Sequence, residues 1–267
     1  MKHNTNILFV SHGGGPLPLL GDPDHQDMVT TLKAIANKIP TPSAILVISA
    51  HWEARVPTIT SAPQPALIYD YYGFPKESYD IQYPAPGEPE LAQEVFHLLD
   101  NAEIKAELDS RRGFDHGLFV PLKIMFPEAD IPCIQLSLVN SLDALTHLEL
   151  GRALQALNWD NLLVIGSGFS YHNLPTFFAP ESREAREKNL AFEAWLHETV
   201  TDKKLTETER KHRLSHWDNA PAARFCHPRE EHLLPLHVCY GMAESASSEY
   251  FTVDILHKKS AMIHWLT

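Results

Sequence analysis

Cysteine is scarce in this sequence, with three among 267 residues, at Cys133, Cys226 and Cys239. The number is odd, no two form a CxxC pair, and no spacing is typical of a zinc motif or a disulfide framework. We therefore expect neither a thiolate metal site nor a fold held by disulfides. Free thiols are typical of a reducing compartment, so the expected location is cytoplasmic.

Basic residues and long apolar runs are also few. Lys and Arg number 22 against 34 Asp and Glu, which gives a net charge of −12, and the cations do not cluster along the chain. Phosphate binding depends on clustered cations, so we expect no nucleic acid and no anionic membrane as a partner. The first apolar run, residues 7–10, is too short for a signal peptide or a transmembrane helix, and we expect neither.

The apolar pattern that is present predicts an α/β fold. Runs typical of buried strands lie at residues 7–10, 44–49, 131–138 and 162–165. Helical spacing predicts helices over residues 28–39, 91–98, 145–157 (with Ser141 as N-cap) and 181–201, and residues 251–266 suit a closing strand or a hairpin around Lys258 and Lys259. Strands that are apolar on both faces and alternate with helices favour a largely parallel or mixed central sheet with helices on both faces. One domain over residues 1–267 is the simplest organisation for this length.

A segment rich in Pro and Tyr, residues 57–89, breaks both periodicities. Its length favours a functional loop that covers a site over a simple connection. The aromatic side chains in it would suit a flat ring, although tyrosines in such loops more often serve packing alone. They are Tyr69, Tyr71, Tyr72 and Phe74.

Histidine is abundant, with 16 residues, and three of them follow predicted strands. His12 follows the first strand, His51 follows the second, and His172 comes shortly after the fourth. Ligands of open α/β sheets bind outside the carboxyl ends of the strands, so we expect these three side chains to meet. A single histidine at a strand end is more often structural than functional, but three together predict a metal or catalytic site.

Two loop segments add further candidates. His116 lies in the sequence GFDHG, and Glu231 and His232 lie in HPREEH. Pro228 suits the first position of a helix, which would put Glu231 and His232 about 100° apart in its first turn, so we expect one of them to face the site. Imidazole and carboxylate ligands without thiolates suit Fe(II), Mn or Zn in a catalytic site with open positions. The remaining candidates are expected on helical or terminal surfaces without a special role, namely His3, His25, His97, His147, His197, His212 and His257.

Seven short motifs, spread in order over nearly the whole chain, resemble the class III extradiol ring-cleavage dioxygenases. The closest resemblance is to the DOPA 4,5-dioxygenase-like branch, which is related to the catalytic subunit of protocatechuate 4,5-dioxygenase. The motifs are SHG at 11–13, SAHW at 49–52, YGFP at 72–75, YPAPG at 83–87, GFDHG at 113–117, HNL at 172–174 and EHLLP at 231–235.

The resemblance implies a one-domain α/β enzyme that opens a catechol-type ring with O₂. It implies one divalent metal ion, Fe(II) for activity and often Zn(II) as isolated, held at the positions that match His12, His51 and His232. The position that matches His172 acts as an acid/base or a further ligand, and that of His116 lines the substrate pocket. In the protocatechuate branch the third ligand is a glutamate, which leaves Glu231 as a minority candidate. Homo-oligomers are compatible with this assignment.

Some features leave the function open. GGGP follows His12 where better-known members have GSP, and residues 217–229 differ as well, so the substrate is undetermined. Asp115 is a candidate to orient His116, and an N-cap role is as good an interpretation. A zinc hydrolase would use three imidazoles equally well. The Memo proteins share the fold and act partly as interaction or metal-handling proteins, so the fold alone does not establish catalysis.

Overall fold

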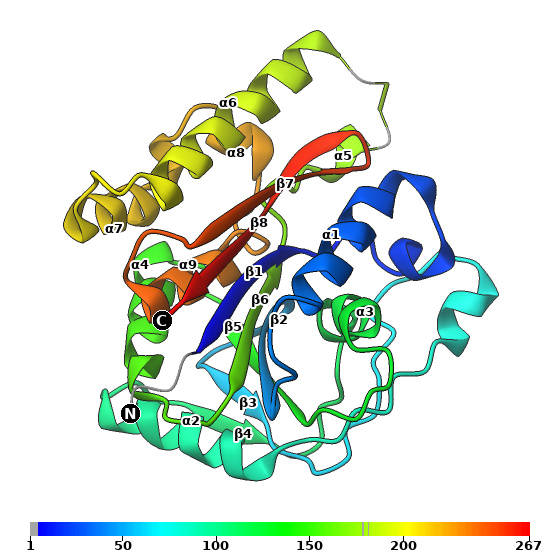
Figure 1. The fold of residues 1–267 in the computed structure, drawn as a ribbon, viewed down its shortest axis with the longest axis vertical. Coiled ribbons are helices and arrows are strands. Elements are labelled where there is room, and N and C mark those ends of the chain that lie inside the picture. Colours follow the sequence, from blue (N-terminus) through cyan, green and yellow to red (C-terminus); the bar gives the residue numbers. More distant parts are fainter. Residues whose placement is uncertain (1–4, 178, 181) are drawn as a thin grey trace.

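A mixed sheet organises the chain, seen here in a computed structural model that describes residues 5–177, 179–180 and 182–267. In the described residues the sheet order is β4-β3-β5-β2-β6-β1-β8-β7, with helices on both sides (Figure 1). The strands are β1 (Asn6–Ser11), β2 (Ala44–Ala54), β3 (Thr58–Thr60), β4 (Glu107–Asp109), β5 (Cys133–Val139), β6 (Leu162–Gly168), β7 (Glu249–Ile255) and β8 (Lys258–Leu266).

The centre of the sheet is parallel and buried. Strands β5, β2, β6 and β1 pair in parallel, and nearly every residue in them is buried. They correspond to the four strands predicted from the apolar runs, because a strand covered on both faces needs apolar side chains at successive positions. Their carboxyl ends lie at one edge of the sheet, which is the edge where the histidines were expected.

One margin of the sheet is the predicted closing hairpin, in which β8 pairs antiparallel with β1 and with β7. The turn lies at Leu256 and His257, whose φ angles are 50° and 62°, as a two-residue hairpin turn requires. It therefore precedes Lys258 and Lys259, which begin β8 and were expected at the turn itself.

Helices cover both faces of the sheet. Helix α3 packs on β2, β6 and α1, while α9 packs on β6, β1 and α4 from the opposite side (Figure 1). The helices are α1 (Gln26–Ala36), α2 (Pro89–Asn101), α3 (His116–Met125), α4 (Ala144–Ala153), α5 (Leu174–Phe177), α6 (Arg183–Thr201), α7 (Glu207–Ser215), α8 (Ala223–Cys226) and α9 (Leu234–Ala243). The predicted α/β class and its mixed sheet are confirmed.

Two helix starts differ from the prediction. The N-cap of α4 is Asp143, whose carboxylate accepts a hydrogen bond from the Thr146 backbone N–H at 2.7 Å, so Ser141 lies before the helix. No helix begins at Pro228, because residues 228–233 form bends and turns and α9 starts at Leu234. Pro235 occupies the first turn of α9, where its missing N–H costs nothing.

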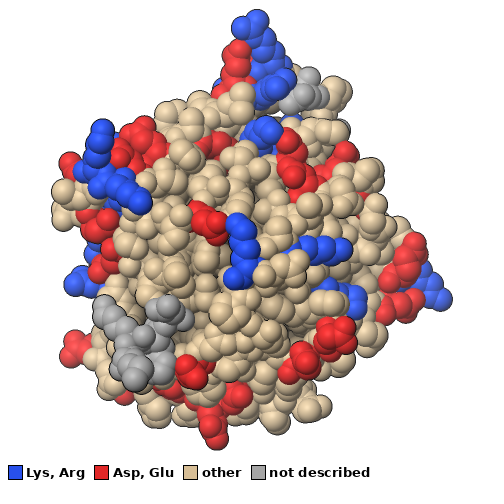
Figure 2. All heavy atoms as spheres, in the orientation of Figure 1, with Lys and Arg blue, Asp and Glu red and all other residues tan. Residues whose placement is uncertain are grey.

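The described helices and surface show two further features. None of these helices is both long and apolar enough to cross a membrane. On the face drawn in Figure 2, Lys and Arg side chains are interspersed with Asp and Glu.

Candidate functional site

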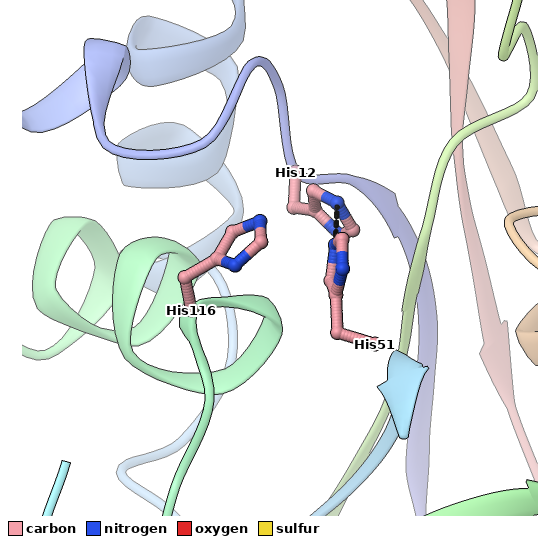
Figure 3. Close-up of side chains that lie close together, drawn as sticks. All are labelled: His12, His51 and His116. Atoms are coloured by element: carbon pink, nitrogen blue, oxygen red, sulfur yellow. Dashed lines mark hydrogen bonds between the residues drawn. The ribbon is translucent and has the colours of Figure 1, made fainter. Parts of the chain in front are cut away.

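Two histidines meet at the carboxyl edge of the sheet. His12 comes directly after β1, and His51 lies inside β2, where the pairing with β5 shifts register between Ser49 and Glu53. Residues 50–52 of β2 have no partner in β5, and this bulge in the pairing turns His51 toward His12. Their Nε2 atoms are 3.0 Å apart, as the dashed line in Figure 3 shows.

His116 faces this pair from the start of α3 (Figure 3). Its ring centroid lies 3.8 Å from that of His51 and 5.6 Å from that of His12. Its Nδ1 is 2.8 Å from Oδ1 of Asp70, which also accepts the His116 backbone N–H at 3.0 Å. Burial alone would raise the pKa of Asp70, but the hydrogen bonds from His116 outweigh it and lower that pKa.

A second cluster joins His172, Glu231 and His232. The rings of His172 and His232 stack with centroids 3.5 Å apart, and both Nδ1 atoms lie close to Oε1 of Glu231, at 3.1 Å and 3.0 Å. Burial alone would raise the pKa of Glu231, yet the hydrogen bonds from the two imidazoles hold it well below its usual range. As predicted, one of Glu231 and His232 faces the site: His232 lines its cavity and Glu231 does not, although a turn before α9 carries them and not a helix that begins at Pro228.

The two clusters share one site. The His232 ring centroid is 5.3 Å from that of His12 and 4.8 Å from that of His51. Gly168, at the end of β6, makes this approach possible, because a Cβ there would overlap the His232 carbonyl oxygen. That carbonyl accepts the Phe169 N–H, and the Gly168 carbonyl accepts the His12 N–H at 3.0 Å. The end of β6 thus holds both histidine segments.

Hydrogen bonds fix the protonation of these rings in a form suited to a metal ion. The single hydroxyl proton of Ser167 is donated to the Gly117 carbonyl, so Nδ1 of His12, 3.0 Å from the Ser167 oxygen, must be the donor in that contact. The carboxylates of Asp70 and Glu231 likewise accept from Nδ1 of His116, His172 and His232. In these four rings Nε2 is left without a proton, which is the usual arrangement of a metal-binding histidine.

The charge state of the rings agrees with that arrangement. Burial, with the neighbouring histidines, lowers the pKa of His12 and of His51 well below the ordinary value. Burial also lowers the pKa of His232 to about 3. Neutral imidazoles at neutral pH are what metal ligation requires. Ring nitrogens of His12, His51 and His116 all lie within 4.8 Å of one another and could hold one metal ion.

A cavity of about 480 Å³ opens above the five histidines. Tyr71, Tyr72 and Phe74 line it, as expected for the Pro- and Tyr-rich segment 57–89, whereas Tyr69 is not among its lining residues and its hydroxyl donates to the Ile81 carbonyl at 2.7 Å. The segment therefore contributes aromatic rings to one wall of the site.

Comparison with known proteins identifies this arrangement. Residues 3–264 match the family model described as the catalytic LigB subunit of aromatic ring-opening dioxygenase. The chain belongs to the LigB family. The resemblance seen in the motifs is thereby confirmed, and with it the enzyme class, an extradiol ring-opening dioxygenase. LigB-family dioxygenases use a metal, in agreement with the histidine cluster.

Several relatives of this LigB-family chain have been named. It is 40% identical to "Dioxygenase tasH" of Hapsidospora irregularis, over 93% of this chain and 83% of that protein. It is 38% identical to "4,5-DOPA dioxygenase extradiol" of Beta vulgaris, with 94% and 90% covered, and 36% identical to the protein of that name from Escherichia coli K12, with 86% and 82% covered. A crystal structure of an uncharacterized Escherichia coli K12 protein superposes with a TM-score of 0.77 at 29% identity, with 97% and 99% covered.

Sequence reasoning missed two residues of the site and left two roles open for Asp115, which occupies the N-cap position of α3. Asp70 orients His116, whereas Asp115 instead accepts hydrogen bonds from Ser49 at 2.8 Å and Arg112 at 3.1 Å. His25, expected on the surface, is buried, and its Nε2 accepts the Gly14 N–H at 2.9 Å. His147 is buried as well, and His3 lies outside the described residues. Neither Asp70 nor His25 sits in a pattern that a sequence would reveal.

A buried carboxyl group supports the segment that carries His172. Glu193 on α6 accepts hydrogen bonds from Ser170 at 2.6 Å and Tyr250 at 3.2 Å, and Ser170 accepts the Ala261 N–H at 2.7 Å. Burial raises the pKa of Glu193 to about 7 from its ordinary 4.5. The folded protein therefore keeps this proton over a range in which the unfolded chain loses it.

This shift predicts a pH-dependent loss of stability. As pH rises from about 4.5 to 7, Glu193 ionises in the unfolded chain and not in the folded one. Its contribution to the free energy of unfolding therefore falls by up to about 3 kcal/mol over this range and is constant above pH 7. Denaturant unfolding should show that the free energy of unfolding decreases more between pH 4.5 and pH 7.5 in the wild type than in Glu193→Gln. The exposed Glu198→Gln on the same helix is the control, and equal losses in all three proteins would contradict the prediction.

Proposed function

We propose that this LigB-family chain is an Fe(II)-dependent extradiol dioxygenase that opens a catechol-type ring with O₂, with the ion held by His12, His51 and His232. The observation that carries this proposal is the convergence of neutral imidazoles whose Nδ1 atoms are engaged elsewhere, beneath a cavity with aromatic walls. The Nε2 atoms of His12 and His51 are 3.0 Å apart, close enough for both to bind one ion.

The expected ion supplies Lewis acidity for the catechol hydroxyls and a path for electrons between catechol and O₂. Zn(II) is compatible with the same ligands and would be the ion retained on isolation in air. The protein itself must then provide the orientation of the catechol and the sites for its protons.

His172 is proposed as the general base. Glu231 fixes its Nδ1 proton, so Nε2 is the atom that accepts the proton of the second catechol hydroxyl and later returns one. Stacking on His232 holds the ring beside the expected ion. The arrangement resembles other catalytic histidines in that a carboxylate sets the tautomer and the free nitrogen faces the reacting group.

His116 is proposed to accept a hydrogen bond from a catechol hydroxyl at Nε2, because its Nδ1 donates to Asp70. Asp70 holds its Nδ1, and Oδ2 of the same carboxylate lies 3.8 Å from Nδ1 of His51. One carboxylate on the segment 57–89 thus orients His116 and lies close to His51. Through it, packing of that segment affects the site directly.

Oxygen uptake tests the function. Protein loaded anaerobically with Fe(II) should consume O₂ with a catechol and form a yellow semialdehyde, and L-DOPA is a first compound to include because two relatives bear its name. Hydrolysis by the zinc form without O₂ uptake would favour a hydrolase. Metal binding with no turnover of any catechol would favour a Memo-like role.

The third ligand can be tested by competition with a chelator. We expect His232→Ala to remove the ion, and Glu231→Gln to weaken binding by about tenfold, because a carboxylate that orients a ligand typically contributes that much. His116→Ala should retain the ion. Loss of the ion in Glu231→Gln but not in His232→Ala would show a carboxylate ligand, and loss in His116→Ala alone would make His116 the third ligand.

A further inference from the structure

The cavity above the histidines has two chemically different ends. Its floor carries the five histidines, where the two catechol oxygens are expected. Its outer wall is apolar and is built by Leu17, Phe74, Leu174, Phe177 and Leu256. Among the described residues that line the cavity, none is Lys, Arg, Asp, Glu, Asn, Gln, Ser or Thr.

Two arginines that contact residues next to the site are engaged with other groups. Arg229 donates to both oxygens of Glu53, at 2.6 Å and 2.7 Å, and lies 3.4 Å from Glu231. Arg112 pairs with Asp115 and stacks over Trp52. Neither lines the cavity, and the buried Lys258 of the adjoining hairpin does not line it either. A carboxylate in the cavity would find no cationic partner among the described residues that line it.

The neutral donors around the cavity are also few. A glycine-rich turn such as 13–15 often offers N–H groups to anions, but the Gly14 N–H already donates to His25, whose ring Asp22 fixes from the other side at 2.8 Å. The Tyr71 hydroxyl donates to the Ser78 carbonyl at 2.6 Å. Tyr72, with 92% of its surface exposed, therefore carries the hydroxyl left at the rim.

The cavity is large enough for a molecule bigger than unsubstituted catechol. Its volume of about 480 Å³ is well above the roughly 150 Å³ in which an apolar cavity binds benzene. A dihydroxylated ring on the histidines leaves the space against the apolar wall to a substituent. Burying a carboxylate there without a partner is costly, whereas an alkyl or aryl group would gain from leaving water.

We propose that the natural substrate is an uncharged catechol whose ring carries an apolar substituent packed against this wall. The proposal rests on the ring-cleaving function proposed above and names its substrate class. It separates this chain from an enzyme for amino-acid or carboxylic-acid catechols, which would require a charged partner in the cavity.

A matched pair of substrates tests the proposal. The catechols 4-isobutylcatechol and 3,4-dihydroxyphenylacetate have substituents with the same number and connectivity of heavy atoms, and a methylene group separates the carboxylate from the ring in the second. With the Fe(II) enzyme we expect kcat/KM to be at least about tenfold higher for the isobutyl compound, with L-DOPA at or below the acetate. Equal or higher values for the acetate or for L-DOPA would overturn the proposal.

Anaerobic calorimetry separates this result from the proposed function. The isobutyl compound should bind the Fe(II) protein at least about tenfold more tightly than the acetate when no turnover occurs. If the isobutyl compound binds more tightly and neither compound is cleaved under O₂, the ring-cleaving function fails, but the preference of the apolar cavity wall for an apolar substituent is supported. If both are cleaved but bind equally, the function stands and the proposed substrate class fails.

A charge placed at the rim provides the complementary test. Tyr72→Arg should raise kcat/KM for the acetate relative to the isobutyl compound by several-fold, and Tyr72→Gln, which adds polarity without charge, should not. The exposure of Tyr72 makes misfolding of either variant an improbable cause of a change. An unchanged ratio in Tyr72→Arg would show that the substituent does not face this wall and would overturn the proposal.

Discussion

His12→Ala and His51→Ala should each leave the protein essentially without its metal ion. His12 is buried and His51 is partly buried, and their Nε2 atoms are 3.0 Å apart. Removal of one of three ligands from a site with open positions destroys most of the chelate, so retention of the other two should not preserve the ion. Elemental analysis of protein purified in parallel with the wild type provides the measurement.

Two controls make that result specific. His97→Ala removes an exposed imidazole from α2 and should keep full metal content. Circular dichroism should show that His12→Ala and His51→Ala retain their secondary structure, because the parallel strands that carry them are held by apolar packing. Full metal occupancy in both variants would place the ion elsewhere in the chain.

The sequence was sufficient to predict the strands that deliver His12, His51 and His172. Buried parallel strands leave a strong signal, since both faces must be apolar, and their carboxyl ends are where ligands bind. The bulge that turns His51 toward His12 could not be predicted in this way. A register shift depends on how β2 pairs with β5, and that pairing is a property of the assembled sheet.

The residues that orient the histidines were less predictable, for a related reason. Asp70 and His116 are 46 positions apart, and no periodicity connects them. The placement of Glu231 and His232 depended on whether a helix begins at Pro228 or at Leu234. Both Pro228 and Pro235 are suited to the first turn of a helix, so the sequence did not decide between them. The family resemblance supplied the ligand assignment that the local pattern left open.

His172→Phe should reduce kcat for a good catechol by about 10² to 10⁴ while metal content stays near that of the wild type. The phenyl ring keeps the volume of the imidazole and its stacking on His232, but it removes the nitrogen that would hold the catechol proton and the one facing Glu231. The increase in rate with rising pH that a general base produces should disappear in the variant, a change that loss of packing alone would not cause.

Glu231→Gln is a useful comparison for His172→Phe. It keeps an oxygen that can accept from Nδ1 of His172, so the base stays oriented when the negative charge is removed. We expect kcat to fall less than in His172→Phe and the rise of the rate with pH to remain. Metal loss in His172→Phe as large as in His12→Ala would instead make His172 a fourth ligand. A catechol that binds through both oxygens would then have to displace a protein group, and the assignment of His172 as the base would be wrong.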